Sequence, residues 1–198
     1  TRYIGDWSSD VCSSDLIPHD FTEKYVFTGH RASVRCVVND ARPWSAEDPH
    51  RYRVMVKLIG PTREYVSLLT GFRRVRVEHG EIRVNDQRVT LRGVNRHDHH
   101  PVRGKAVTRE DMLADVLAMK RLNCNAVRTS HYPNDPAFLD LCDEHGLYVV
   151  AEANIEAHAY NTLLCNDPDY LATWLARGSR MVVRRSEEHT SELQSPMY

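Results

Sequence analysis

This sequence lacks long apolar runs, closely spaced cysteine pairs and an excess of charge of one sign. No apolar run approaches the roughly 20 residues that a membrane-spanning helix needs, so we expect no membrane partner. The cysteines form no Cys-x-x-Cys pair and no signal peptide is recognisable, which favours a reduced, cytoplasmic setting. Lys and Arg number 26 against 27 Asp and Glu. This balance does not indicate a nucleic-acid partner, which would need clustered basic residues.

The two ends of the chain lack the hydrophobic patterning of the rest. Residues 6–16 and 185–195 are rich in Ser and acidic residues and show no apolar periodicity. One stretch of DNA, read from opposite strands, can encode both peptides, as expected of a translated sequencing-library adaptor. We therefore predict that residues 1–16 and 185–198 are non-native, and that the source nucleotides carry this inverted repeat. Without these ends, the formal net charge of residues 17–184 is +3 rather than −1.

Residues 17–75 have the pattern of β-strands. The segments 32–38 and 52–58 alternate or are β-branched, and Asn39-Asp40 and Gly60-Pro61 are typical breakers between strands. No helical period is present. We predict the C-terminal part of an antiparallel β-sandwich whose first strands are missing.

Residues 76–184 alternate short strands with helices. A predicted hairpin that pairs residues 72–77 with 81–84 leads into this segment. Three short apolar runs then lie about one helix apart in the sequence, at Leu91–Asn95, Asn125–Arg128 and Leu147–Val150. Strands that alternate with helices at this spacing predict parallel βαβ units.

The helices between these strands have recognisable ends. Thr108 is the expected N-cap of the first, with acidic residues in its first turn, and Leu113, Val116, Leu117 and the stem of Lys120 form its expected buried face. Asp135-Pro136 begins the second helix and Gly146 ends it. A third begins at Asp167-Pro168 and runs towards Arg184.

Polar side chains follow all three strands, which is where an α/β barrel places its catalytic groups. His97 comes directly after the first strand and can donate to a sugar hydroxyl or a developing charge. The cluster His97-Asp98-His99-His100 is also compatible with a zinc site or with an ordinary solvated loop. We favour a substrate-facing role for His97.

Arg128 and His131 lie at and just past the end of the second strand. Arg128 is either a structural salt-bridge partner or the cation that keeps an active-site carboxylate ionised. After the third strand, Glu156 and His158 are spaced so that both side chains point to the same side if the strand continues, with Glu152 deeper on that side. Glu156 and His158 can share a cation such as Mg²⁺, or form an ordinary Glu–His hydrogen bond.

Five segments of the sequence form a distinctive set: Trp44–Pro49, Gly71–Arg76, Arg92–Pro101, Asn125–Asn134 and Gly146–Glu156. Together they resemble the β-galactosidases of glycoside hydrolase family 2, the large bacterial lactose-cleaving type. Sister β-glucuronidases share Arg-Thr-Ser-His-Tyr-Pro but do not usually carry the His-x-His-His or Glu156-x-His158 pattern. Ala151 departs from the best-known members, which have an acidic residue there.

The resemblance implies a fold of class α/β plus all-β: an immunoglobulin-like β-sandwich over residues 17–75, followed by the first three β/α units of a TIM (β/α)8 barrel over residues 76–184. It implies that His97 and His131 stabilise the transition state and bind substrate together with Glu152. Arg128 matches the arginine that supports the nucleophile, and Glu156 and His158 match Mg²⁺ ligands. The family also uses a monovalent cation whose ligands are not in this chain.

The same resemblance implies hydrolysis of terminal β-D-galactose, from lactose for example, by a retaining two-carboxylate mechanism. The acid/base of the family follows a fourth strand in an Asn-Glu pair, and the nucleophile comes later. This sequence contains neither, so we expect the fragment itself to be inactive and its parent, a tetramer in many large members, to be the enzyme. Two rivals remain: another family 2 glycosidase of β-glucuronidase type, and a non-catalytic module that binds sugar or metal.

Overall fold

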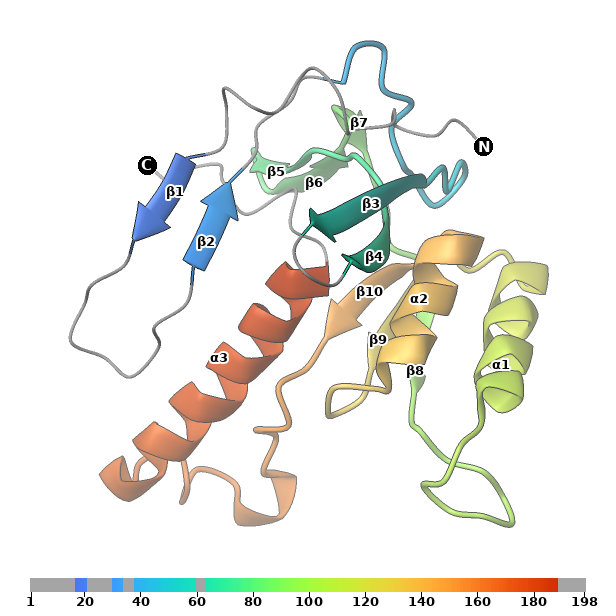
Figure 1. Ribbon diagram of the computed structural model, residues 1–198. Coiled ribbons are helices and arrows are strands. Elements are labelled where there is room, and N and C mark those ends of the chain that lie inside the picture. Colours follow the sequence, from blue (N-terminus) through green and yellow to red (C-terminus); the bar gives the residue numbers. More distant parts are fainter. Residues whose placement is uncertain (1–16, 21–29, 34–37, 60–62, 189–198) are drawn as a thin grey trace. The chain divides into compact units, whose positions relative to one another are not determined.

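The computed structural model describes residues 17–20, 30–33, 38–59 and 63–188 of the 198-residue chain. These residues divide into two compact units. The first contains the chain up to Arg42 together with Tyr52–Leu69, and the second contains Pro43–Arg51 and the chain from Thr70 onwards. Figure 1 shows their helices and strands.

The first unit consists of short β-strands. β1 (Ile17–Asp20) pairs antiparallel with β2 (His30–Ser33), and β3 (Tyr52–Ile59) pairs with β4 (Arg63–Thr70). The strand predicted at 52–58 is thus confirmed, whereas most of the one predicted at 32–38 lies outside the described residues. Large apolar side chains on β3 and β4 are exposed, Leu58 at 62% and Val66 at 52%. A two-stranded sheet has too little surface to bury them.

The second unit starts with a three-stranded antiparallel sheet, β5 (Val75–Glu78), β6 (Glu81–Val84) and β7 (Gln87–Arg88). Its two turns contain residues of positive φ, His79-Gly80 and Asn85-Asp86, as two-residue hairpin turns require. The predicted hairpin is therefore confirmed. Because strand side chains alternate, the valines of β5 lie on one face and its charged residues on the other.

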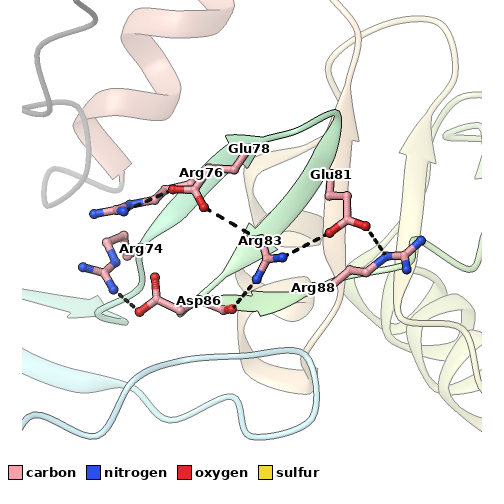
Figure 2. Close-up of polar contacts among 7 residues, drawn as sticks. All are labelled: Arg74, Arg76, Glu78, Glu81, Arg83, Asp86 and Arg88. Carbon is pink, nitrogen blue, oxygen red and sulfur yellow. Dashed lines mark hydrogen bonds and ion pairs between the residues drawn. The ribbon is translucent and has the colours of Figure 1, made fainter.

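The charged face of this sheet carries a connected row of ion pairs (Figure 2). Arg83 is at its centre and bonds Glu81 at 3.2 Å and the backbone oxygen of Asp86 at 3.2 Å. Further pairs join Arg76 to Glu78 and Arg88 to Glu81, at 3.2 and 3.3 Å. These side chains are mostly exposed, and exposed pairs contribute only about 0–1 kcal/mol each.

A parallel sheet follows, with strand order β10-β9-β8 (Figure 1). The helix α1 (Arg109–Arg121) connects β8 (Gly93–Arg96) to β9 (Ala126–Thr129), and α2 (Pro136–His145) connects β9 to β10 (Tyr148–Ala151). Two 3-10 turns, η1 (His158–Tyr160) and η2 (Pro168–Tyr170), precede α3 (Leu171–Glu188). The predicted βαβ units are thus confirmed, each strand within one or two residues of its expected position.

Capping explains where these helices begin and end. Thr108 and Asp111 form a reciprocal capping box at the start of α1. Asp135 caps α2, Pro136 occupies its first turn, and Gly146 ends it with a left-handed φ of 76°.

α3 continues to Glu188, past Arg184, and a helical backbone there does not bear on the adaptor prediction. Within the part of the chain that the structure describes, none of the helices combines the length and apolar character that a membrane crossing requires.

The core lies between the parallel sheet and the helices α1 and α2. It contains Val116 of α1, Val127 of β9 and Phe138 of α2, all at most 1% exposed. The predicted face of α1 is partly wrong, because Met112 and Met119 are buried beside Val116. Leu113 and Leu117 are only half-buried. The ammonium group of Lys120 donates to the backbone oxygens of Ala46 and Gly146, at 3.2 and 2.9 Å.

The segment Pro43–Arg51 packs within the second unit although it precedes β3 in sequence. Trp44 is 2% exposed, and its indole N–H donates to the backbone oxygen of Asp143, in the last turn of α2, at 2.8 Å. Its ring meets Tyr148 edge-on, with centroids 5.7 Å apart. The segment therefore satisfies one of the helix-end carbonyls, that of Asp143, that α2 leaves without an intrahelical partner.

Candidate active site

The strand ends of the parallel sheet gather the predicted polar groups. Strand register places Asn95, Arg128 and Val150 side by side. Their neighbours along each strand, Val127 among them, pack towards the helices, so this row lies on the opposite face. Because the strands are parallel, the residues that follow each of them emerge at the same edge.

Glu152 is the centre of the site. It follows β10, and its backbone N–H donates to the hydroxyl of Thr129 at 3.3 Å. Arg128 donates from Nε to one carboxylate oxygen of Glu152, and Nδ1 of His131 lies 3.0 Å from the other. Burial by itself raises the pKa of Glu152, but the hydrogen bonds from Arg128 and His131 outweigh it, so this pKa lies below its ordinary value. Glu152 is thus held as a carboxylate.

The contact with Glu152 fixes the tautomer of His131. An ionised carboxylate only accepts hydrogen bonds, so Nδ1 of His131 must carry the hydrogen. The 3.5 Å approach of Arg128 to the same Nδ1 is then a contact between two donors and not a hydrogen bond. Nε2 of the neutral ring is left as an acceptor, and it becomes a donor when the ring is protonated. His131 is 38% exposed and can offer this nitrogen to a ligand.

His97 joins His131 from the neighbouring strand. The two rings lie 5.5 Å apart, nearly perpendicular, and His97 is 5.9 Å from the ring of Tyr132. Lys105, which sequence reasoning did not select, adds a positive charge 4.9 Å from the face of Tyr132. Only its place in the loop after β8 could have suggested it. The imidazoles of His97 and His131, the phenol ring of Tyr132 and the cations Lys105 and Arg128 form a rim. Such groups can bind hydroxyl groups and stabilise developing negative charge.

Glu156 and His158 lie together but outside this cluster of contacts. Nδ1 of His158 is 3.5 Å from Glu156, and their side chains are 92% and 40% exposed. The reason that we gave for their pairing is wrong: β10 ends at Ala151, and His158 begins a 3-10 turn. Within the described residues, no group of three His, Cys, Asp or Glu side chains could hold a metal ion. The pair is therefore at most one part of a metal site.

Comparison with known proteins identifies the family. Residues 75–193 match the family described as "Glycosyl hydrolases family 2, TIM barrel domain". The chain belongs to glycosyl hydrolase family 2. Its parallel β/α region corresponds to that barrel, so the predicted mixture of antiparallel sheets and a partial barrel is confirmed at this level.

Family 2 relatives cover most of this chain. The chain is 42% identical to a β-galactosidase of Psychromonas ingrahamii over 81% of its length, and 46% identical to one of Yersinia pestis over 71%. These matches cover 16% and 14% of the relatives, so the chain spans about one sixth of their length.

Solved structures give the same fold. A β-D-glucuronidase of Dictyoglomus thermophilum matches 78% of this chain, and 28% of its own, with a TM-score of 0.68 at 25% identity. A family 2 β-galacturonidase of Eisenbergiella tayi, bound to galacturonate, matches 83% of this chain and 29% of its own, with a TM-score of 0.66 at 27% identity.

Proposed function

We propose that this chain is part of a retaining β-galactosidase that hydrolyses terminal β-D-galactose. The observation that carries the proposal is the identity of 42–46% to relatives named β-galactosidase, over most of the chain. The cluster around Glu152 supports it, because it provides oriented hydrogen-bonding groups for a sugar ring. We assign β1 to β4 to the end of an immunoglobulin-like sandwich.

In this proposal each site residue has a defined task. His97 and His131 bind the galactosyl ring and stabilise charge that develops in the transition state. Arg128 holds a carboxylate ionised: Glu152 in this chain, and a nucleophile contributed by the rest of the protein. Glu152 orients His131 through Nδ1 and thereby directs Nε2 towards substrate. Neither Glu152 nor Glu156 is the acid/base or the nucleophile.

Glu156 and His158 are the residues that would hold Mg²⁺. A carboxylate oxygen and an imidazole nitrogen 3.5 Å apart are compatible with two positions of a six-ligand shell, although oxygen ligands are preferred. A bound Mg²⁺ would supply a fixed positive charge beside the sugar site. The remaining ligands would have to come from other parts of the protein or from water.

The experiment is an assay of the complete protein on nitrophenyl β-galactoside and nitrophenyl β-glucuronide. We expect galactoside to be cleaved with the higher kcat/KM, and the reading frame beyond this chain to contain an Asn-Glu pair after a further strand. Preference for glucuronide would instead support the second candidate, which the β-glucuronidase structure of 25% identity favours. Absence of hydrolysis of either sugar, with no Asn-Glu strand end, would leave a binding module.

A further inference from the structure

Arg96, the last residue of β8, is the most buried charged side chain near the site, with 5% of its side chain exposed. It directly precedes His97, but it lies on the helix-facing side of the sheet. Its guanidinium carbon lies 4.0 Å from the centroid of the Phe138 ring, in the core. A charge in such a place needs several partners to offset its desolvation.

The partners of Arg96 come from both loops that carry the site histidines. Nη1 donates to Asp98 in the loop after β8 and, at 2.7 Å, to Asn134 in the loop after β9. The second oxygen of Asp98 accepts from the backbone N–H of Asp135 at 3.3 Å. Asn134 is itself 4% exposed. The two loops are therefore joined behind His97 and His131 by a buried network of Arg96, Asp98 and Asn134.

A third partner, Asp115 of α1, accepts from Nε of Arg96 at 2.9 Å. Nη2 of Arg96 is buried and has no hydrogen-bond partner among the residues that the structure describes. A buried charge with one unsatisfied nitrogen is a weak source of stability, because desolvation costs about as much as the ion pairs return. What such a network does provide is a single relative geometry for the groups that it connects.

We propose that Arg96, Asp98 and Asn134 form a positioning network that fixes the distance between His97 and His131. The inference rests on the proposed function, since the geometry matters for catalysis only if both imidazoles contact the sugar. None of the three residues touches substrate in this proposal. They act through the loops 97–107 and 130–135, whose first residues bear the site groups.

The test uses the complete protein and four variants: Arg96→Met, Asp98→Asn, Asn134→Asp and the double variant Asp98→Asn/Asn134→Asp. A misplacement of about 1 Å costs roughly 100-fold in rate, so we expect Arg96→Met to lower kcat by about that factor and to change KM by less than about threefold. Each single exchange should lower kcat by about tenfold. Asp98→Asn removes a negative partner of the buried Arg96, and Asn134→Asp places a second carboxylate on the same Nη1, next to Asp98. The double variant restores the net charge around Arg96, but not the second acceptor oxygen of Asp98 or the donation from Asn134 to the backbone oxygen of Tyr132. It should therefore recover kcat only in part, to a value above that of either single variant.

Two control variants separate positioning from stability. Leu141→Ala removes a core side chain of α2 that is 2% exposed, and should lower Tm while leaving kcat unchanged well below that temperature. Arg76→Gln removes an exposed charge of β5 and should change neither. Arg96→Met with near-normal kcat would overturn the inference. A double variant whose kcat is no higher than that of the single variants would overturn it as well. So would a loss of kcat in Leu141→Ala that is as large, for the same fall in Tm, as the loss in the network variants.

Hydrogen exchange provides a readout that does not depend on the sugar. Amides of residues 97–100 and 130–135 should exchange faster in Arg96→Met and in the single variants, and more slowly in the double variant than in either single variant. If the wild type cleaves neither sugar, the proposed function fails while this readout still decides whether the network holds the loops. If Arg96→Met does not fold, the Asp98 and Asn134 variants carry the test, and unchanged exchange in them would refute it.

Discussion

Replacement of Lys120 by Met measures how strongly the hydrogen bonds of its ammonium group stabilise the second unit, including the attachment of the segment Pro43–Arg51. The ammonium group of Lys120 donates to the backbone oxygens of Ala46 and Gly146, at 3.2 and 2.9 Å. Methionine keeps an unbranched stem of similar length and removes the charged donor. The variant therefore removes both hydrogen bonds and leaves the packing of the stem in place.

The magnitude follows from the donor's charge. A hydrogen bond from a charged group contributes about 1.5–3 kcal/mol, but the two bonds share one ammonium group and water can reach the half-buried site. We therefore expect Lys120→Met to lower the free energy of unfolding by about 2 kcal/mol in total. The measurement is urea denaturation of the chain in dilute solution, followed by circular dichroism.

The matched control is Arg121→Met. Arg121 is the next residue of α1, lies in the same last turn and is exposed. Its replacement removes the same charge from the same helix end, so the helix-dipole contribution of about 0.3–1 kcal/mol is common to both variants. The difference between the two isolates the bonds to Ala46 and Gly146. Equal destabilisation by the two variants would refute this account of the attachment.

Three further predictions concern the same unit. Gly146→Ala should destabilise the chain by more than about 1 kcal/mol, because φ is 76° and a Cβ would lie 2.2 Å from the oxygen of Ala46. Gly178→Ala in α3, with open space around it, should instead stabilise the chain by about 0.5–1 kcal/mol, and the same urea titration measures both. Hydrogen bonds from the backbone of Thr108 and from Arg103 lower the pKa of Asp111 from 3.8 to about 2. The stability that this carboxylate contributes is therefore present above pH 3.8 and is lost as pH falls through about 2. Asp111→Asn should abolish this pH dependence, and an NMR titration that gives Asp111 an ordinary pKa would contradict the prediction. The isolated chain should associate as its concentration rises, because large apolar side chains are exposed, with Val77 at 75% and Val102 at 88%. Sedimentation velocity that shows a monomer at all concentrations would count against this.

Sequence reasoning succeeded where a feature depends on neighbours in the chain. The N-cap Thr108, the start of α2 at Asp135-Pro136 and its end at Gly146 follow from local preferences, and the structure confirms them. It was only partly right for the buried face of α1: Val116 is buried as expected, but Met112 and Met119 are buried more deeply than the expected leucines. The rotation of a weakly amphipathic helix is set by the elements that it packs against, and the chain's own periodicity does not reveal it.

The candidate site likewise has a part that could be predicted from the sequence and a part that could not. Strand ends of neighbouring parallel strands meet at one edge, so the approach of His97, His131, Arg128 and Glu152 could be expected from the sequence. The role of Arg96 could not be expected, because an arginine beside a histidine of the predicted site looks like one more polar site residue. Only strand alternation places it on the opposite side, and only the folded chain shows its burial and its partners.

The buried indole of Trp44 has a consequence for how this polypeptide folds during its synthesis. Its partner, the carbonyl of Asp143, is 99 residues further along the chain. At a ribosomal rate of roughly 5–20 residues per second, Asp143 is synthesised about 5 to 20 seconds after Trp44. During that time the indole has only part of its native surroundings, the residues Gly71–Arg73, and the rest of its aromatic surface is uncovered. We therefore expect the nascent chain to be vulnerable to misassociation until α2 has been made.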